Sequence, residues 1–429
     1  MRHLFADLSA FRRDPLGFMR EKGNGTDEPL VKLALGPQPV YLVNSPELVK
    51  PVLNHTEDAI DKGKYIKKLK PAFGNSFLLM SGKESKRRRE VVHATLGRST
   101  VLEQVPAMAA TIRQLAGALA LEEQFNVHKV TGPLTLRLIS VALFGHQVLS
   151  PADELALLRA VHLIEHELEE DMFRIWPRGP KSWLRRRRKY AEAHRIMGLV
   201  VKRVRENAGS SSVLTSLEEM GLSDNDIRDE ILTMLLAGHH TTASAAVWVL
   251  YYLTTQAGLA DRIARECAVV TDDSGDIVAA DLKNAPVSMA LAREVLRLYP
   301  SAWWFSRETK KTVEIAGHTL KKGSALIICP WQMQRHPAYW DDPDSFRMDR
   351  QFNNKAYIPF GVGPRTCVGM GVALLELQLL ALEFASAYHL SAVSETPAPE
   401  PRASLTLIPP PIELSLTIRE NIAFDEAAA

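Results

Sequence analysis

The stretch that decides the fold is Phe360-Gly361-Val362-Gly363-Pro364-Arg365-Thr366-Cys367-Val368-Gly369, which runs directly into an apolar helical pattern from Met370 to Tyr388. Glycines around Cys367 let the backbone bend tightly and bring several amide N–H groups close to one sulfur atom. The following helix directs its positive end at the same sulfur. A cysteine is held as thiolate by such donors, by a helix N-terminus or by a metal. The stretch therefore predicts a thiolate-holding loop.

A lone cysteine is also often a small buried hydrophobic residue, so the neighbouring residues must show whether Cys367 is a ligand or part of the core. Here they match F-G-x-G-x-R-x-C-x-G at every fixed position. This pattern resembles the haem-binding loop of the cytochrome P450 superfamily. The resemblance implies haem b with the Cys367 thiolate as axial ligand of the iron. It also implies that Phe360, Gly361, Arg365 and Gly369 contact the cofactor.

Composition places the chain among ordinary globular proteins: 429 residues, 46% hydrophobic and 24% charged. The net charge of +2 gives no indication of a nucleic-acid partner. Its three cysteines, Cys267, Cys329 and Cys367, favour a reducing compartment over a disulfide framework.

The N-terminal segment from Met1 to Asp14 carries five charged residues, unlike a signal peptide or a membrane anchor. No other stretch reaches about 18 uninterrupted apolar residues. We therefore expect a soluble, cytoplasmic monomer, which within the resembled family is the bacterial type.

A long helix is predicted from Ser223 to about Gln256, with a capping-box-like start. Its centre, Ala237-Gly238-His239-His240-Thr241-Thr242, resembles the family's oxygen-activating motif, A/G-G-x-acid-Thr-Thr/Ser. Gly238 lacks a side chain and Thr241 can return its hydroxyl to a backbone carbonyl, so the helix can open locally. The resemblance gives catalytic roles to Gly238 and Thr241 and a haem contact to Ala237.

His240 departs from this motif, because the family has a carboxylate there to relay protons. An imidazole also shuttles protons near neutral pH, so His240 remains a catalytic candidate. The alternatives are a structural hydrogen bond at His240, a water chain through Thr241, or a reaction that tolerates weak proton delivery. His239 points about 100° away around the helix and is expected to face another helix or the lid.

Glu294-Val295-Leu296-Arg297 matches the family's E-x-x-R position. Residues three apart share one helix face, so Glu294 and Arg297 can pair in a buried network. The segment from His336 to Phe352 resembles the one preceding the haem loop, and its Arg350 is expected to close that network.

Arg89 and Arg307 match the family's propionate-binding arginines and join Arg365 in that role. Ser85 stands where the family has an aromatic residue or histidine, which weakens one propionate contact. The basic run from Lys83 to Arg89 has two readings. It is a solvated helix face, or it steers an acidic electron-transfer partner to the thiolate side.

The resemblance also indicates a substrate pocket beneath a mobile loop between Asp58 and Ser81, with the hairpin around Leu405 to Pro409 touching substrate. Core packing is the alternative for each apolar candidate. The pocket candidates are Phe77, Leu78, Leu79, Met234, Trp303, Trp304, Phe305 and Leu407.

Further elements follow from local patterns. Strands are predicted at Leu30 to Leu35 and Pro39 to Val43, and an antiparallel meander within Thr312 to Cys329. Helical periodicity covers Ala107 to Phe144 and Pro151 to Glu170, and the chain breaks at Pro177-Arg178-Gly179-Pro180. The basic run from Trp183 to Lys189 is read as a solvated helix start, with a nucleic-acid or membrane-surface role as alternatives. The residues from Phe424 to Ala429 are read as a frayed tail.

We therefore expect a mainly α protein with small β-sheets and the cytochrome P450 fold. One domain covers residues 1–429, with a β-rich part at about 25–60 plus 310–330. The resemblance places haem between the long central helix and the helix after the Cys loop.

The activity implied by the resemblance is monooxygenation of a small hydrophobic substrate by O2, within secondary metabolism. Terpenoids, fatty acids, polyketides and aromatic compounds all fit. The chain shows no dinucleotide fingerprint, so electrons are expected from a separate ferredoxin or flavodoxin and its NAD(P)H reductase. Two alternatives remain open: a peroxide-driven, coupling or rearranging enzyme on the same haem, and a haem-binding sensor without turnover.

Overall fold

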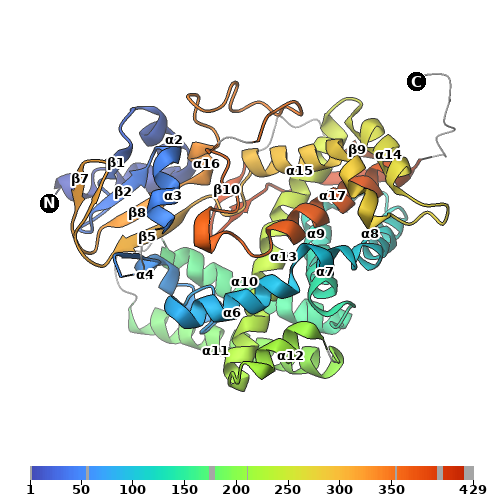
Figure 1. The fold of residues 1–429 in the computed structure, drawn as a ribbon, viewed down its shortest axis with the longest axis horizontal. Coiled ribbons are helices and arrows are strands. Elements are labelled where there is room, and N and C mark those ends of the chain that lie inside the picture. Colours follow the sequence, from blue (N-terminus) through green and yellow to red (C-terminus); the bar gives the residue numbers. More distant parts are fainter. Residues whose placement is uncertain are drawn as a thin grey trace.

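The structure is a computed structural model that describes residues 2–54, 58–172, 179–209, 211–352, 355–393 and 400–419. The predicted tail from Phe424 to Ala429, and Pro177 and Arg178 of the predicted chain break, lie outside these residues. Helices make up most of the described chain, and the largest sheet lies at one end of the molecule with the N-terminus (Figure 1). The predicted mainly α class is confirmed.

The largest sheet has five strands in the order β1-β2-β8-β5-β3. Its strands are β1 (Leu30–Leu33), β2 (Val40–Val43), β8 (Ala325–Ile328), β5 (Phe305–Thr309) and β3 (Ile60–Asp61). The predicted hairpin is confirmed, since β1 and β2 pair antiparallel. The predicted meander is wrong for its last strand, because β8 pairs parallel with β2 and antiparallel with β5. All four residues of β8 are buried, which suits a central strand better than a surface meander.

The other strands form small sheets. The first two strands of the predicted meander do form a hairpin, β6 (Val313–Ile315) with β7 (His318–Leu320). The C-terminal hairpin is also present, as β10 (Arg402–Ala403) with β11 (Leu407–Ile408). A three-stranded sheet joins β4 (Phe125–Asn126), β12 (Glu413–Ile418) and β9 (Tyr388–Ala392).

Helices form most of the rest of the described chain. The predicted run from Ala107 to Phe144 is two helices, because β4 interrupts it and Asn126 caps the second, accepting from the His128 N–H at 3.1 Å. The α-helices are α1 (Leu8–Arg13), α2 (Pro15–Asn24), α3 (Pro46–Asn54), α4 (Gly63–Lys67), α5 (Lys70–Phe73), α6 (Gly82–Thr95), α7 (Arg98–Leu102), α8 (Val105–Leu119), α9 (Val127–Phe144), α10 (Pro151–Met172), α11 (Pro180–Asn207), α12 (Ser212–Glu219), α13 (Asp224–Thr255), α14 (Leu259–Val270), α15 (Pro286–Leu298), α16 (Pro330–Met333) and α17 (Met370–Ala387). Short 3-10 helices cover Arg2–Phe5, Ala279–Asn284 and Gly363–Arg365.

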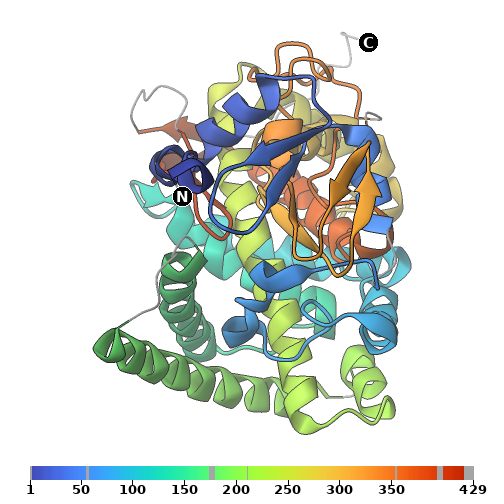
Figure 2. The same cartoon turned by 90° about the vertical axis from the view of Figure 1, so that its left-hand side faces the viewer.

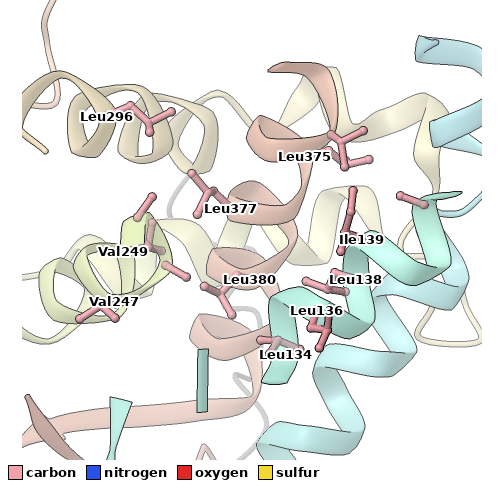
Figure 3. Packing of buried hydrophobic residues seen from close by; sticks show 14 of the residues in the cluster. Leu134, Leu136, Leu138, Ile139, Val247, Val249, Leu296, Leu375, Leu377 and Leu380 are labelled. Atoms are coloured by element: carbon pink, nitrogen blue, oxygen red, sulfur yellow. The ribbon is translucent and has the colours of Figure 1, made fainter. Parts of the chain in front are cut away.

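Two core helices, α13 and α17, position the site. Helix α13 begins as predicted, with the Ser223 hydroxyl oxygen accepting from the Asp226 N–H at 3.2 Å, and it crosses the middle of the molecule (Figure 2). Helix α17 packs among α9, α13 and α15, and its Leu377 and Leu380 belong to the same buried cluster as Val249 of α13 (Figure 3). Among the described residues, α17 is also the one helix long and apolar enough to cross a membrane, and 67% of it is buried. Its apolar character on all sides matches this place in the core.

Candidate functional site

The Cys loop, residues 360–369, is held by its own backbone. The Cys367 N–H donates to the Phe360 carbonyl at 2.9 Å. Gly361 and Gly363 have φ angles of 67° and 77°, the left-handed region that favours glycine. A Cβ at Gly363 would also lie 2.3 Å from the Asn54 side-chain oxygen, so a larger residue is excluded there. These constraints place Cys367 just before the start of α17.

The Cys367 sulfur is the reactive atom that this loop presents. Cys367 is exposed, whereas Cys267 and Cys329 are buried. The surrounding protein raises the pKa of the Cys367 thiol, while the Gly369 N–H and the charge of Arg89 favour the thiolate. The Gly369 N–H and Arg89 are therefore the groups that would stabilise an anionic sulfur ligand here, and the thiolate itself stays a prediction.

Three guanidinium groups lie around the Cys loop. Arg89 donates to the Thr366 carbonyl, and Arg365 donates to the Met80 carbonyl at 3.4 Å. Burial, together with the charge of Arg365, lowers the pKa of Arg307 to about 10. Burial and the charge of Arg365 also lower the pKa of Arg89.

These cations suit an anionic ligand. Within the described residues, neither Arg89 nor Arg307 forms an ion pair with a carboxylate. Cations this close to one another repel, so a ligand with two carboxylates beside the Cys367 sulfur would relieve the repulsion. The propionate groups of haem have that chemistry, and the donor set therefore fits haem.

The centre of α13 provides the opposite side of the candidate site. The Thr241 hydroxyl donates to the Ala237 carbonyl at 2.7 Å, as predicted, and the Thr241 carbonyl accepts from Ser301 at 2.7 Å. The predicted local opening of the helix is not seen, because α13 is regular from Asp224 to Thr255. A Cβ at Gly238 would lie 2.6 Å from Ile139 Cγ1 of α9, so this glycine permits close helix packing. Its predicted catalytic role stays a prediction.

His240 has two partners outside α13. Its Nε2 lies 2.7 Å from Glu165 Oε1 on α10, and its Nδ1 lies 3.2 Å from the Thr406 hydroxyl in the C-terminal hairpin. Burial alone would lower the pKa of His240, but the hydrogen bond and charge of Glu165 raise it. A carboxylate is thus present at this site, but it comes from α10 and contacts the side chain of His240 instead of standing at position 240 as in the motif.

His239 faces α9, as expected. Its Nδ1 lies 3.2 Å from the Thr135 hydroxyl, and its side chain is buried. Burial, with a contribution from His240, lowers the pKa of His239 to about 4, so it is neutral at pH 7. His239 therefore belongs to helix packing.

The predicted network around Glu294 is present. Arg297 donates to both Glu294 oxygens at 2.7 Å, and Arg350 donates to one of them at 2.9 Å. Glu294 and Arg297 are fully buried, and Arg297 also binds the backbone carbonyls of Pro343 and Ser345. This network ties the segment before the Cys loop to α15.

The predicted pocket residues lie in different environments. Phe77, Met234, Trp303 and Leu407 are buried, and Leu78, Leu79, Trp304 and Phe305 are half-buried. Trp303 donates to the Ser404 carbonyl at 2.9 Å and is fully buried, which favours the core alternative for this ring. Phe305 lies in β5, 3.8 Å from where a Cβ at Gly361 would stand, so it packs against the Cys loop.

Sequence reasoning missed four polar residues that organise the site: Lys62, Arg88, Glu165 and Glu230. Arg88 follows Ser85 by three residues and precedes Val92 by four, so it shares the buried face of α6. That spacing could have separated Arg88 from the solvated basic run. No local pattern indicates Glu165 as the partner of His240.

Known proteins resemble the chain over nearly its whole length. A family model described as cytochrome P450 matches residues 13–416. Cyclooctatin synthase of Streptomyces melanosporofaciens is 30% identical over 425 residues, covering 92% of this chain and 90% of that protein. Cyclooctat-9-en-7-ol 5-monooxygenase of the same organism is 26% identical over 416 residues, covering 92% and 89%. Cytochrome P450 4V2 of Mus musculus is 28% identical over 391 residues, covering 81% and 74%. A crystal structure of a cytochrome P450, CYP102L1, matches with a TM-score of 0.80 at 21% identity, covering 96% of this chain and 99% of that one, and confirms the predicted fold.

Proposed function

The chain belongs to the cytochrome P450 family and is a cytochrome P450 monooxygenase, and we propose that it binds haem b through Cys367 and oxygenates a compact terpenoid. The observation that carries the haem site is the place of the exposed Cys367 sulfur, just before α17 and beside the Gly369 N–H and Arg89, the two groups that oppose the rise in its pKa. Arg89, Arg307 and Arg365 are the proposed propionate ligands. Phe360, Gly361, Gly369 and Ala237 are the proposed neighbours of the ring.

Haem with a thiolate ligand supplies the chemistry that activates O2, inserting one oxygen atom into the substrate and reducing the other to water. The chain's own residues would control protons and water. The Glu165 carboxylate favours a proton on His240 Nε2, and the Thr406 hydroxyl contacts Nδ1 on the other side of the ring. We propose that this imidazolium is the proton source beside Thr241, whose hydroxyl can exchange its bond to Ala237 for one to a water.

The substrate class rests on two lines of support. The two Streptomyces relatives are named cyclooctatin synthase and cyclooctat-9-en-7-ol 5-monooxygenase. The candidate wall residues are apolar, including Leu78, Met234 and Phe305. We propose a cyclic terpenoid, tested by screening terpenes and fatty acids for the haem spin-state shift that displacement of a water ligand produces.

The electron donor is proposed to be a separate ferredoxin or flavodoxin with its NAD(P)H reductase. Helix α6 reaches the Cys loop through Arg89, and Lys83, Lys86 and Arg87 are exposed on the same helix. An acidic donor would be steered to this face by charge, and its binding would weaken as salt rises.

The test of thiolate ligation is the absorption spectrum of the dithionite-reduced protein with carbon monoxide. Wild type should show the strongly red-shifted Soret band of a thiolate-ligated haem, and Cys367→Ala should lose it. The matched control is Cys267→Ala, which changes a buried cysteine of α14 outside the Cys loop and should keep the band. A band typical of a neutral ligand in folded wild-type protein would contradict the proposal, and product formed only with peroxide would favour the peroxide-driven alternative.

A further inference from the structure

The turn formed by residues 75–80 precedes α6 and is bound to α13 through its backbone. The Asn75 N–H donates to Asp229 Oδ2 at 2.7 Å, and the Phe77 N–H donates to Glu230 Oε1 at 2.9 Å. Both carboxylates belong to the first turns of α13. Two backbone donors of a short connecting turn are thus bound by side chains from a distant helix.

The carbonyl groups of the same turn are bound by cations. Lys62 donates to the carbonyls of Phe77 at 3.1 Å and Met80 at 2.6 Å, and also to that of Leu78. Arg88 donates to the Asn75 carbonyl at 3.1 Å. Lys62 and Arg88 are 7% and 4% exposed, so both charges lie largely away from water.

Burying these charges is costly unless they are fully hydrogen-bonded, so the arrangement must fix the turn tightly. Arg88 also lies 3.1 Å from Glu230 Oε1, which joins the donors of α6 to the acceptors of α13. The family resemblance predicts that the region from Asp58 to Ser81 is a mobile cover of the pocket. For the turn itself, the contacts indicate a rigid part of the molecule.

The turn lies between the two elements that flank the candidate haem site. At its end, Arg365 of the Cys loop donates to the Met80 carbonyl and to the Ser81 hydroxyl, each at 3.4 Å. At its start, Glu230 stands eleven residues before Thr241, roughly 16 Å along α13. Residues 77–80 therefore reach from the first turns of α13 to the Cys loop, with Phe77 buried and Leu78, Leu79 and Met80 half-buried.

We propose that Lys62, Arg88 and Glu230 are positioning residues that hold this turn as a fixed wall of the substrate space and so restrict the enzyme to compact substrates. None of the three needs to touch the substrate. The inference rests on the proposed function, because the wall acts on ligands that approach the haem.

Lys62, Arg88 and Glu230 are called the clamp below. The first test is amide hydrogen exchange in the holoenzyme, which measures how firmly the clamp holds the turn and requires no known substrate. Lys62→Met removes the charged donor and keeps the approximate shape of the side chain, and Glu230→Ala removes the acceptor of the Phe77 N–H and of Arg88. Each should speed exchange at residues 75–80 by about tenfold, the effect of losing roughly 1.4 kcal/mol of local stability. Lys67→Met and Glu219→Ala, both at exposed positions, are the matched controls and should leave exchange there unchanged. Unchanged exchange in both clamp variants would overturn the clamp.

The second test asks whether the wall limits ligand size. Imidazole and the bulkier 4-phenylimidazole bind haem iron and shift its Soret band, so their dissociation constants are measurable without a known substrate. Both clamp variants should bind 4-phenylimidazole several-fold more tightly than wild type and imidazole equally well. Faster exchange without this selective gain would overturn the role in substrate restriction. If the wild-type carbon monoxide spectrum lacks the thiolate band, the proposed function fails, while the exchange result still decides the clamp.

Discussion

Two buried arginine–glutamate pairs in this protein are built differently. Arg297 uses all five of its N–H donors: two to the oxygens of Glu294 and three to the backbone carbonyls of Gln334, Pro343 and Ser345. Glu294 accepts further from the Arg350 side chain. Every polar side-chain atom of this buried pair therefore has a hydrogen-bond partner.

The pair of Arg88 and Glu230 is less complete. Arg88 reaches one oxygen of Glu230, at 3.1 Å, and the other oxygen has no hydrogen-bond partner among the described residues although it is buried. Burial raises the pKa of Glu230 to about 7, even though Arg88 and the Phe77 N–H favour the carboxylate. The comparison indicates that the first pair is a permanent lock, while the second is a clamp whose charge depends on pH.

The largest effect is expected from Arg297→Ala. It leaves the carboxylate of Glu294 buried with half of its donors gone, and it removes the Arg297 donors of the Gln334 and Pro343 carbonyls, while the Ser345 carbonyl keeps its bond from Arg350. Breaking such a pair costs about 3–5 kcal/mol, which is a large part of the stability of a typical domain. Urea unfolding and the yield of haem-loaded protein measure the effect. A midpoint close to that of wild type would show that the network does not lock the fold.

Glu230→Gln should change how stability depends on pH. The folded-state pKa of about 7 lies above the ordinary value of 4.5 for a glutamate carboxyl. Protonated Glu230 therefore adds stability that is fully present below about pH 4.5 and is lost as pH rises through 7, by roughly 3 kcal/mol at about 1.4 kcal/mol for each unit of pKa. The free energy of unfolding of the variant should vary less than that of wild type between pH 4.5 and 7. Parallel profiles would contradict the raised pKa, and Glu219→Gln serves as the exposed control.

The two pairs also show how far sequence reasoning reaches. Glu294 and Arg297 are three residues apart on one helix, so their contact follows from helix geometry, and the Cys loop follows from a contiguous motif. Arg88 and Glu230 are 142 residues apart, and no local pattern links them. The same reason explains the misplaced strand β8, whose partner β2 lies far earlier in the chain.

The pair of His240 and Glu165 should affect chemistry more than stability. Both side chains are about 30% exposed, so Glu165→Gln should cost under about 1 kcal/mol. Because Glu165 raises the pKa of His240, the variant should lose the His240 proton at lower pH than wild type. As pH rises, the fraction of consumed NAD(P)H that is recovered as product should therefore begin to fall at a lower pH in the variant than in wild type. Glu170→Gln, an exposed change on the same helix, should keep the wild-type profile, and equal profiles for all three proteins would exclude the relay.

The smallest effect is expected from Arg347→Ala, three residues before Arg350. The Arg347 backbone N–H donates to Glu294 at 3.0 Å and survives the change, while its side chain pairs with exposed Asp349 at 2.9 Å. An exposed pair in water adds little, so the urea midpoint should equal that of wild type. Arg350→Ala removes a donor to Glu294 together with bonds to the carbonyls of Asp341 and Asp342, and should lower the midpoint clearly. If both changes had the same effect, the lock would depend on the charge of the segment rather than on the completeness of its hydrogen bonds.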